Sequence, residues 1–218
     1  MREQDTAFIG KITAAVTHEF MNVLSTIKET SGLMEDLLAL SGENSFKHHE
    51  KFSRTLIIIR EQVRRGMEIS EMLNNFAHSM DEPEAWIEIN ELLDQLSILV
   101  QRFAKLKKVV LTLNPLETPL EIRIDPFRLH LILVTCLEYC FDHTANGGTV
   151  TMKALRRKNG IAIQCLMEPD SKSMGNMDEI PHELTGLQET LHHINAQLVP
   201  ISGPGQQGVE LIVHLKVK

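Results

Sequence analysis

The chain has 218 residues and a formal net charge of −7, and 43% of its residues are hydrophobic and 23% charged. These values are ordinary for a globular protein with one large domain or two small ones. The acidic balance argues against broad nucleic-acid binding, which needs a basic surface. The sequence shows no run of about 18 apolar residues that would span a membrane and no apolar segment of a secretion signal. We therefore expect a cytoplasmic protein.

The first predicted element is a long amphipathic helix over residues 6–40. One narrow stripe of this helix is apolar and is expected to be buried: it holds Ile9, Ile12, Val16, Phe20, Val23 and Ile27. On the same helical wheel, His18 lies roughly 160° from the centre of that stripe and Asn22 roughly 120° from it. His18 is therefore predicted to face solvent or a partner.

A second helix is predicted over residues 46–80, after a segment rich in Gly, Ser and Asn that suits the end of one helix and the cap of the next. Its apolar seam recurs every three or four residues: Phe52, Leu56, Ile59, Val63, Gly66, Ser70, Leu73, Ala77 and Met80. The two helices should form an antiparallel hairpin. Because each helix has one seam and little else to bury it against, we predict a homodimer with a four-helix bundle.

Pro83 interrupts the helical pattern and marks the predicted domain boundary. We place a helical domain at residues 1–81, a linker at 82–86 and a second domain at 87–218. The strands predicted beyond the second helix cover residues 86–89, 109–113, 120–124, 149–155, 161–167, 198–202 and 209–217, and the helices cover 90–106, 126–143 and 184–196. This order predicts an α+β fold, in which helices cover one face of a mixed sheet.

The three cysteines indicate neither a disulfide framework nor a metal site. They are an odd number and form no CxxC motif, whereas both kinds of framework need regular pairs. We expect Cys136, Cys140 and Cys165 to be buried as small apolar side chains.

A histidine-bearing helical hairpin followed by a mixed α/β sandwich resembles the transmitter core of two-component sensor histidine kinases. The strongest local match is AAVTHEFMNVLSTI, which is similar to the phosphoacceptor box of that family. In that box the histidine is followed at once by an acid, here Glu19, and four positions later by Asn, here Asn22. The proline often found one residue later is Val23 in this chain. The resemblance implies that His18 is a phosphoacceptor.

The nucleotide motifs of that family are not matched. Its nucleotide-binding helix carries two Asn residues four apart, and alignment on the closing Gly-Gly-Thr places Thr135 and Tyr139 there. No glycine follows the acid in residues 168–170, where the family's adenine motif should lie. Only Gly186 and Leu187 remain of the last glycine-rich motif, which would wrap phosphates. The resemblance therefore implies neither magnesium-ATP binding nor autophosphorylation, and we expect no cofactor of the protein's own.

Without ATP as the donor, His18 could still take a phosphoryl group from the aspartyl phosphate of a receiver domain and pass it to another. The receiver domain supplies its own magnesium. Glu19 could orient the imidazole through its other ring nitrogen. Kinase-like histidine phosphotransferases with an inactive ATP domain show this combination, and a phosphotransferase is our leading prediction.

Three other readings stay open. Glu19 and Asn22 match the positions that support dephosphorylation of a receiver domain in the kinase family, where the amide places an attacking water. A non-catalytic dimeric scaffold or inhibitor, docking a kinase or a receiver domain, is a second alternative. A divergent kinase that still binds ATP is the third.

Further residues are candidates for contact with a receiver domain. Ser25 and Glu29 continue the polar face of His18. The basic residues of the hairpin could steer an acidic receiver surface or simply be solvated; these are Lys11, Lys28, Arg60, Arg64 and Arg65.

Overall fold

A computed structural model describes residues 3–40, 49–80, 83–168, 179–203 and 206–214. The chain divides into two compact units, one of residues 9–75 and one of residues 1–8 together with 76–218. The predicted linker at residues 82–86 stays a prediction, since residue 82 lies outside the described part.

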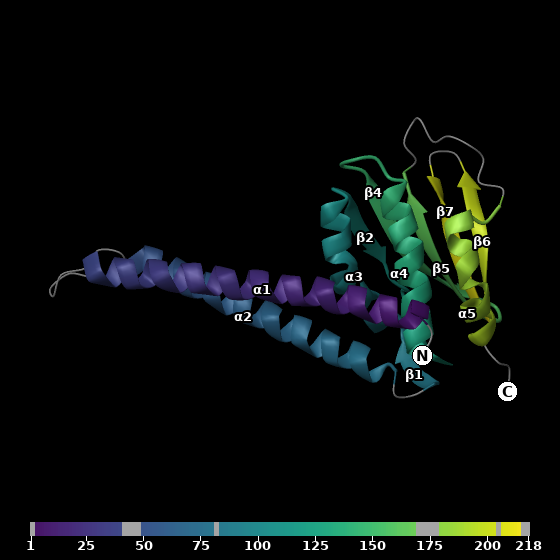
Figure 1. Cartoon of the computed structure of the whole chain (residues 1–218), viewed down its shortest axis with the longest axis horizontal. Coiled ribbons are helices and arrows are strands. Elements are labelled where there is room, and N and C mark those ends of the chain that lie inside the picture. Colours follow the sequence, from purple (N-terminus) through teal and green to yellow (C-terminus); the bar gives the residue numbers. More distant parts are fainter. Residues whose placement is uncertain (1–2, 41–48, 81–82, 169–178, 204–205, 215–218) are drawn as a thin grey trace. The chain divides into compact units, whose positions relative to one another are not determined.

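The first unit consists of most of two long helices, α1 (Glu3–Leu40) and α2 (His49–His78), which run antiparallel (Figure 1). The predicted stripe of α1 is confirmed in part, because Ile12, Val16 and Val23 are buried and Ile9 and Ile27 are half-buried. Phe20, in contrast, is 36% exposed. The predicted exposure of His18 is confirmed.

The predicted seam of α2 is only partly confirmed within the single chain. Leu56, Val63 and Met80 are exposed, whereas Ile69 and Met72 are buried in their place. The helix carries apolar side chains on two faces, and periodicity alone does not tell which face packs on α1. The second face remains at the surface of the single chain.

Two contacts join the helices close to His18. A methyl group added at Gly66 of α2 would lie 3.3 Å from Val23 Cγ1 of α1, so the helices approach closely there. Nearby, Arg65 Nη2 lies 2.9 Å from Glu19 Oε2. The pairing of α1 with α2 therefore combines a close apolar contact with an ion pair.

The second unit is built around a five-stranded sheet of order β2-β4-β5-β7-β6. Its strands are β2 (Val110–Asn114), β4 (Thr149–Arg157), β5 (Gly160–Met167), β6 (Ala196–Gly203) and β7 (Gln206–His214). β2 is parallel to β4, and the other pairs are antiparallel. The predicted mixed sheet is therefore confirmed.

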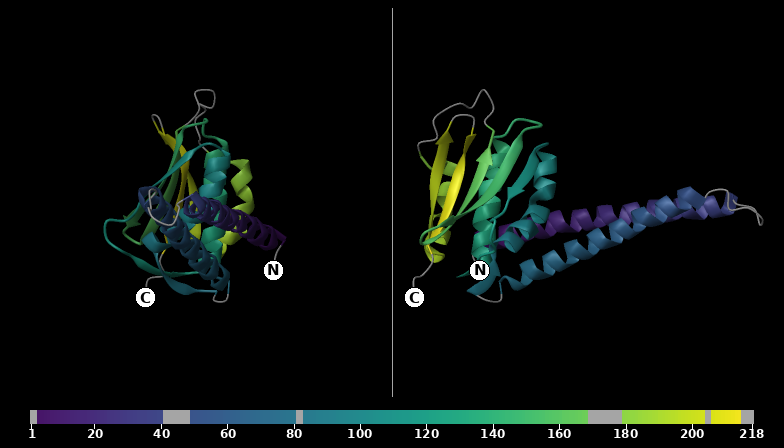
Figure 2. Two further views of the ribbon diagram at one scale, coloured as in Figure 1. Left: turned by 90° about the vertical axis from the view of Figure 1, so that its left-hand side faces the viewer. Right: turned by 180° about the vertical axis from the view of Figure 1, so that it is seen from behind.

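Three helices cover one face of this sheet, as Figures 1 and 2 show. They are α3 (Ile89–Leu106), α4 (Pro126–Asp142) and the short α5 (Gln188–His193), which follows the 3-10 helix η1 (His182–Leu187). Strands β1 (Ala85–Glu88) and β3 (Glu121–Ile124) pair separately as a small antiparallel sheet. The layers agree with the predicted α+β architecture.

The last helix is shorter than expected. The sequence predicted a continuous helix over residues 184–196, but α5 ends at His193. Asn195 then adopts a φ of 52°, in the left-handed region that ends many helices. Of the strand predicted over residues 209–217, residues 215–217 lie outside the described part.

The core between α4 and the sheet contains all three cysteines, and the prediction that they are buried is confirmed. Cys140 Sγ lies 3.5 Å from the carbonyl oxygen of Cys165 on β5. Burial raises the pKa of the Cys165 thiol to about 12. These thiols are therefore protonated and unreactive in the folded protein.

An aromatic cluster packs within this unit beside the start of α4. The ring of Phe76 lies 5.7 Å from Phe8, 6.2 Å from Phe127 and 5.9 Å from His130, centroid to centroid. His130 is buried, and its Nδ1 donates to the Pro126 carbonyl at 2.6 Å. Burial lowers the pKa of His130 to about 4, so the ring is neutral at pH 7.

Candidate functional site

Five of the six predicted site residues share one exposed face of α1. Lys11, His18, Asn22, Ser25 and Glu29 are separated by seven, four, three and four residues. These spacings return to the same side of a helix, and all five side chains are exposed. The helix alone therefore aligns the predicted phosphoacceptor with its predicted partner-binding residues.

The contact at the centre of this face joins His18 to Asn22. The amide nitrogen Nδ2 of Asn22 lies 3.3 Å from Nδ1 of the His18 ring. The two residues are one helical turn apart, so the regular backbone of α1 holds both side chains in reach of each other. The other ring nitrogen, Nε2, is the atom farther from the backbone and is the one that a partner reaches first.

Glu19 lies on a different face of α1 and is buried. Its Oε2 accepts a hydrogen bond from Arg65 Nη2 at 2.9 Å, and the side chain of Glu19 is only 12% exposed against 44% for Arg65. The sequence interpretation gave Glu19 the task of orienting the His18 ring, but the ring nitrogen in question has the Asn22 amide beside it. The catalytic role of Glu19 stays a prediction.

Sequence reasoning missed Arg65 as the partner of Glu19. A signal for this pair was present, because each residue lies 23 positions from Gly42 in the sequence. A hairpin that turns near Gly42 would bring them to the same level. The expectation that Arg65 either steers a receiver domain or is merely solvated left out this contact within the hairpin.

Arg64, another of the predicted steering residues, also has partners on its own helix. It forms ion pairs with Glu61 at 2.9 Å and with Glu68 at 2.5 Å. The hydrogen bond and the charge of Glu61, followed by the charge of Glu68, raise the pKa of the Arg64 guanidinium. Since all three side chains are about half exposed or more, this cluster contributes little to stability.

The two α4 positions that the sequence analysis matched to the family's asparagines have contacts of their own. The Thr135 hydroxyl donates to the Leu131 carbonyl of its own helix at 2.8 Å. The Tyr139 ring packs against the His143 ring, with 4.2 Å between centroids. Partial burial, and then the charge of Glu183 in η1, raise the pKa of the Tyr139 phenol. An aromatic ring with a partner of its own therefore lies at the second of the two positions that the sequence analysis matched to the family's asparagines.

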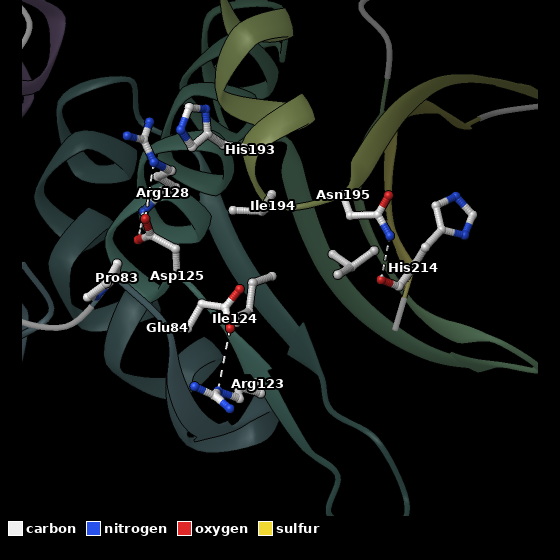
Figure 3. Close-up of a pocket in the computed structure, with 11 residues that line it drawn as sticks. Pro83, Glu84, Arg123, Ile124, Asp125, Arg128, His193, Ile194, Asn195 and His214 are labelled. Carbon is white, nitrogen blue, oxygen red and sulfur yellow. Dashed lines mark hydrogen bonds and ion pairs between the residues drawn. The ribbon is translucent and has the colours of Figure 1, made fainter. Parts of the chain in front are cut away.

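A separate cavity of about 290 Å³ lies at the start of α4 (Figure 3). Its charged side chains pair with each other, Arg123 Nε with Glu84 at 3.5 Å and Arg128 Nε with Asp125 at 3.1 Å. On another side of the cavity, the side-chain amide of Asn195 donates a hydrogen bond to the carbonyl oxygen of His214 at 3.1 Å. No predicted site residue lines this cavity. Because four separate segments build it, no local sequence motif marks it.

Neither a metal-binding group nor a membrane span is evident in the described parts of the chain. Among these residues, no three His, Cys, Asp or Glu side chains are placed to hold a metal ion. None of the described helices is long and apolar enough to cross a membrane.

The order of the two units along the chain, a helical hairpin followed by an α/β domain, is also found in solved histidine kinase structures. No family model matches the sequence, and no curated protein matches it either. Among solved structures, the chain is similar to the histidine kinase AdeS of Acinetobacter baumannii, with a TM-score of 0.52 and 9% identity over 90% of this chain and 98% of that one. It is also similar to the nucleotide-free catalytic domain of the histidine kinase ThkA, with a TM-score of 0.53 and 9% identity over 62% of this chain and 97% of that one.

At such low identities the similarity shows the fold and leaves the activity open. It covers both a helical hairpin and an α/β domain of the ATP-binding type. The resemblance inferred from the phosphoacceptor box is therefore confirmed at the level of architecture.

Proposed function

We propose that this protein is a histidine phosphotransferase of a two-component phosphorelay, in which His18 exchanges a phosphoryl group with the aspartate of a receiver domain without using ATP. The observation that carries the proposal is the exposed His18–Asn22 pair, at 3.3 Å, on a hairpin of the histidine kinase type. An exposed imidazole on a regular helix is accessible to a partner from solvent.

The chemistry requires little from this protein. The nucleophilic nitrogen of His18 attacks the phosphorus of the aspartyl phosphate, an N–P bond forms, and the O–P bond breaks to release the aspartate carboxylate. The receiver domain supplies the magnesium that neutralises the phosphoryl oxygens. The hairpin needs only to present the ring.

Two features of α4 support a donor other than ATP. The Thr135 hydroxyl is engaged with its own helix, and the Tyr139 ring packs on His143. Neither side chain offers the pair of amides that the family uses for nucleotide and magnesium, and a phenol ring adds bulk at the ion's position. Saturable, magnesium-dependent ATP binding would contradict this part of the proposal.

A homodimer and a receiver-domain partner belong to the same proposal. The second apolar face of α2 supports the dimer, because Leu56, Val63 and Met67 recur along one side of the helix and are 45%, 46% and 69% exposed. Packing this face against a second hairpin would complete a four-helix bundle. Ser25, Glu29 and Lys11 are the proposed receiver contacts beside His18.

The direct test is transfer from a phosphorylated receiver domain to the purified protein. Label should appear on the wild type and on the His192→Ala variant, which removes an exposed histidine of α5 as a matched control. The His18→Ala variant should remain unlabelled. Equal labelling of His18→Ala, or no labelling of the wild type by its cognate receiver, would refute phosphotransfer. Receiver binding without transfer by either protein would instead indicate a scaffold.

Dephosphorylation of the receiver is the second candidate function, and the Asn22 amide next to the His18 ring favours it. An amide at this place can hold a water against the aspartyl phosphate. Under this function the Asn22→Ala variant should slow the loss of phosphate from the receiver, while His18→Ala should keep part of the activity. Unchanged dephosphorylation by Asn22→Ala would exclude this role for the amide.

A further inference from the structure

The contact between Asn22 and His18 couples the orientation of the amide to the position of the proton on the imidazole. In the structure the amide nitrogen of Asn22 faces Nδ1 of His18 at 3.3 Å. An amide nitrogen only donates hydrogen bonds, so this orientation of the amide pairs with a ring whose Nδ1 is the acceptor. The proton of the ring is then on Nε2. In this arrangement Nε2 has no lone pair available for attack on phosphorus.

The alternative arrangement needs only a rotation of the amide. A half-turn about the last side-chain bond of Asn22 exchanges its nitrogen with its oxygen, and this kind of bond has a broad, roughly two-fold energy profile. The amide oxygen would then accept from Nδ1–H, and the ring would keep a lone pair on Nε2. Both side chains are exposed, so no packing opposes the rotation.

Glu19 is poorly placed to impose either arrangement. Its carboxylate is buried and holds Arg65 across the hairpin at 2.9 Å. A carboxylate at Nδ1 would accept permanently and fix the reactive form, because it has no donor to offer. An amide can do both, so the residue beside Nδ1 in this chain can hold the ring in either form.

We infer that Asn22 is a positioning residue that regulates His18 through its tautomer: the amide nitrogen keeps Nδ1 occupied in the resting protein, and rotation to the amide oxygen yields the form whose Nε2 can accept a phosphoryl group. The inference deepens the proposed function and rests on it. In the transfer step the ring keeps its proton on Nδ1 while Nε2 forms the N–P bond, so no proton has to leave the ring before attack.

The first test measures the tautomer directly in the full chain by 15N NMR of the histidine ring nitrogens, with His18→Ala used to assign the His18 signals. The wild type should show the Nε2–H form. The Asn22→Asp variant, in which a carboxylate replaces the amide at the same size, should move the ring toward the Nδ1–H form. Identical ring nitrogen signals in the two proteins would overturn the inference.

The second test measures reactivity without a receiver domain, using potassium phosphoramidate as a small phosphoryl donor. Asn22→Asp should label His18 faster than the wild type by about two- to tenfold, the range that one hydrogen bond of ordinary net strength produces. Thr17→Asp adds the same charge at an exposed neighbouring position on another face of α1 and should not give this acceleration. Equal rates for wild type and Asn22→Asp, or equal acceleration by Thr17→Asp, would overturn the inference.

These outcomes separate the inference from the proposed function. If the ring nitrogen signals and the phosphoramidate rates change as expected but no receiver domain transfers a phosphoryl group to His18, the phosphotransferase proposal fails and the control of the tautomer by Asn22 stands. If receiver transfer occurs but neither readout responds to Asn22→Asp, the phosphotransferase proposal stands and the inference fails. Circular dichroism of the variants excludes loss of the helix as the cause.

Discussion

Arg65 links the two helices at the level of the candidate site, and its loss should weaken the hairpin. Arg65→Ala would leave the largely buried Glu19 carboxylate without its cross-helix partner at 2.9 Å. We expect a decrease of about 1 to 2 kcal/mol in the free energy of unfolding, because the arginine is itself partly exposed and the attraction is partly screened. Urea titration of the wild type and the variant measures the difference.

The neighbouring arginine supplies a matched control for this change. Arg64→Ala removes exposed ion pairs to Glu61 and Glu68 on the same helix and should alter stability by less than about 0.5 kcal/mol. If both variants lose the same stability, the Glu19–Arg65 pair has no special role in the hairpin.

His130 should make the stability of the protein depend on pH. The folded protein holds this ring neutral down to about pH 4, since burial lowers its pKa from the usual 6.5. The unfolded chain binds a proton there at higher pH, so the contribution of His130 is complete above about pH 6.5 and is lost as the pH falls toward 4. The loss is on the order of 3 kcal/mol for a shift of this size.

The measurement for His130 is the slope of unfolding free energy against pH. Wild type should lose more stability than His130→Leu between about pH 7 and pH 4, although the variant is less stable at pH 7 because the Pro126 carbonyl loses its donor. Parallel pH profiles for the two proteins would show that another group determines the acid sensitivity.

At the residue scale, the sequence predicted which side chains are exposed better than it predicted which side chains contact each other. His18 was placed correctly because its position on the helical wheel depends only on the helix itself. Glu19 was expected to act on its sequence neighbour, yet it turns toward Arg65, 46 residues away. Exposure follows from the spacing of residues along one helix, whereas the contact between Glu19 and Arg65 depends on how α2 packs on α1.

At the scale of elements, the pairing of β5 with β7 depends on a glycine. A methyl group at Gly208 would lie 2.0 Å from the carbonyl oxygen of Cys165 on β5, a backbone atom that cannot move aside by itself. Gly208→Ala should therefore lower the free energy of unfolding by more than about 2 kcal/mol. Thermal or urea unfolding checks the value.

Gly203 provides the comparison for this substitution. It lies in β6, paired with the same strand β7, but a methyl group there would have only a contact of 3.9 Å with the Gln206 carbonyl oxygen. Gly203→Ala should be close to neutral. Equal destabilisation by both substitutions would mean that the loss comes from strand propensity and not from the close approach at Gly208.

The elements themselves were mostly predictable because caps and periodicity are local. Asp125 accepts a hydrogen bond from the Arg128 backbone N–H at 3.0 Å, just before Pro126, which is the cap the sequence indicated for α4. The end of α5 was missed because Asn195 was read as helical, although Asn is also common in the left-handed turn after a helix. The separate pairing of β1 with β3 depends on tertiary contacts that no local pattern specifies.

At the scale of the whole molecule, the exposed face of α2 should determine the oligomeric state. We expect the wild type to be a dimer by size-exclusion chromatography with light scattering. Met67→Glu places a charge at a side chain that is 69% exposed in the single chain and should yield monomers, because a dimer would have to bury that charge.

The control for the dimer is a variant that places the same negative charge on the α/β unit instead of on α2. Leu106 of α3 is 66% exposed. Leu106→Glu should have the same molar mass in light scattering as the wild-type dimer. A monomeric wild type, or a dimer that survives Met67→Glu, would contradict the proposed bundle interface.

The His18–Asn22 pair lies within a single turn of one helix, and this has an evolutionary consequence. Such a site is inherited as one short segment, since it needs no side chain from α2 or from the α/β unit to bring its two members together. Substitutions on α4, for example at Thr135 or Tyr139, can accumulate without disturbing it. The segment that holds the His18–Asn22 pair and helix α4 are thus free to diverge at different rates.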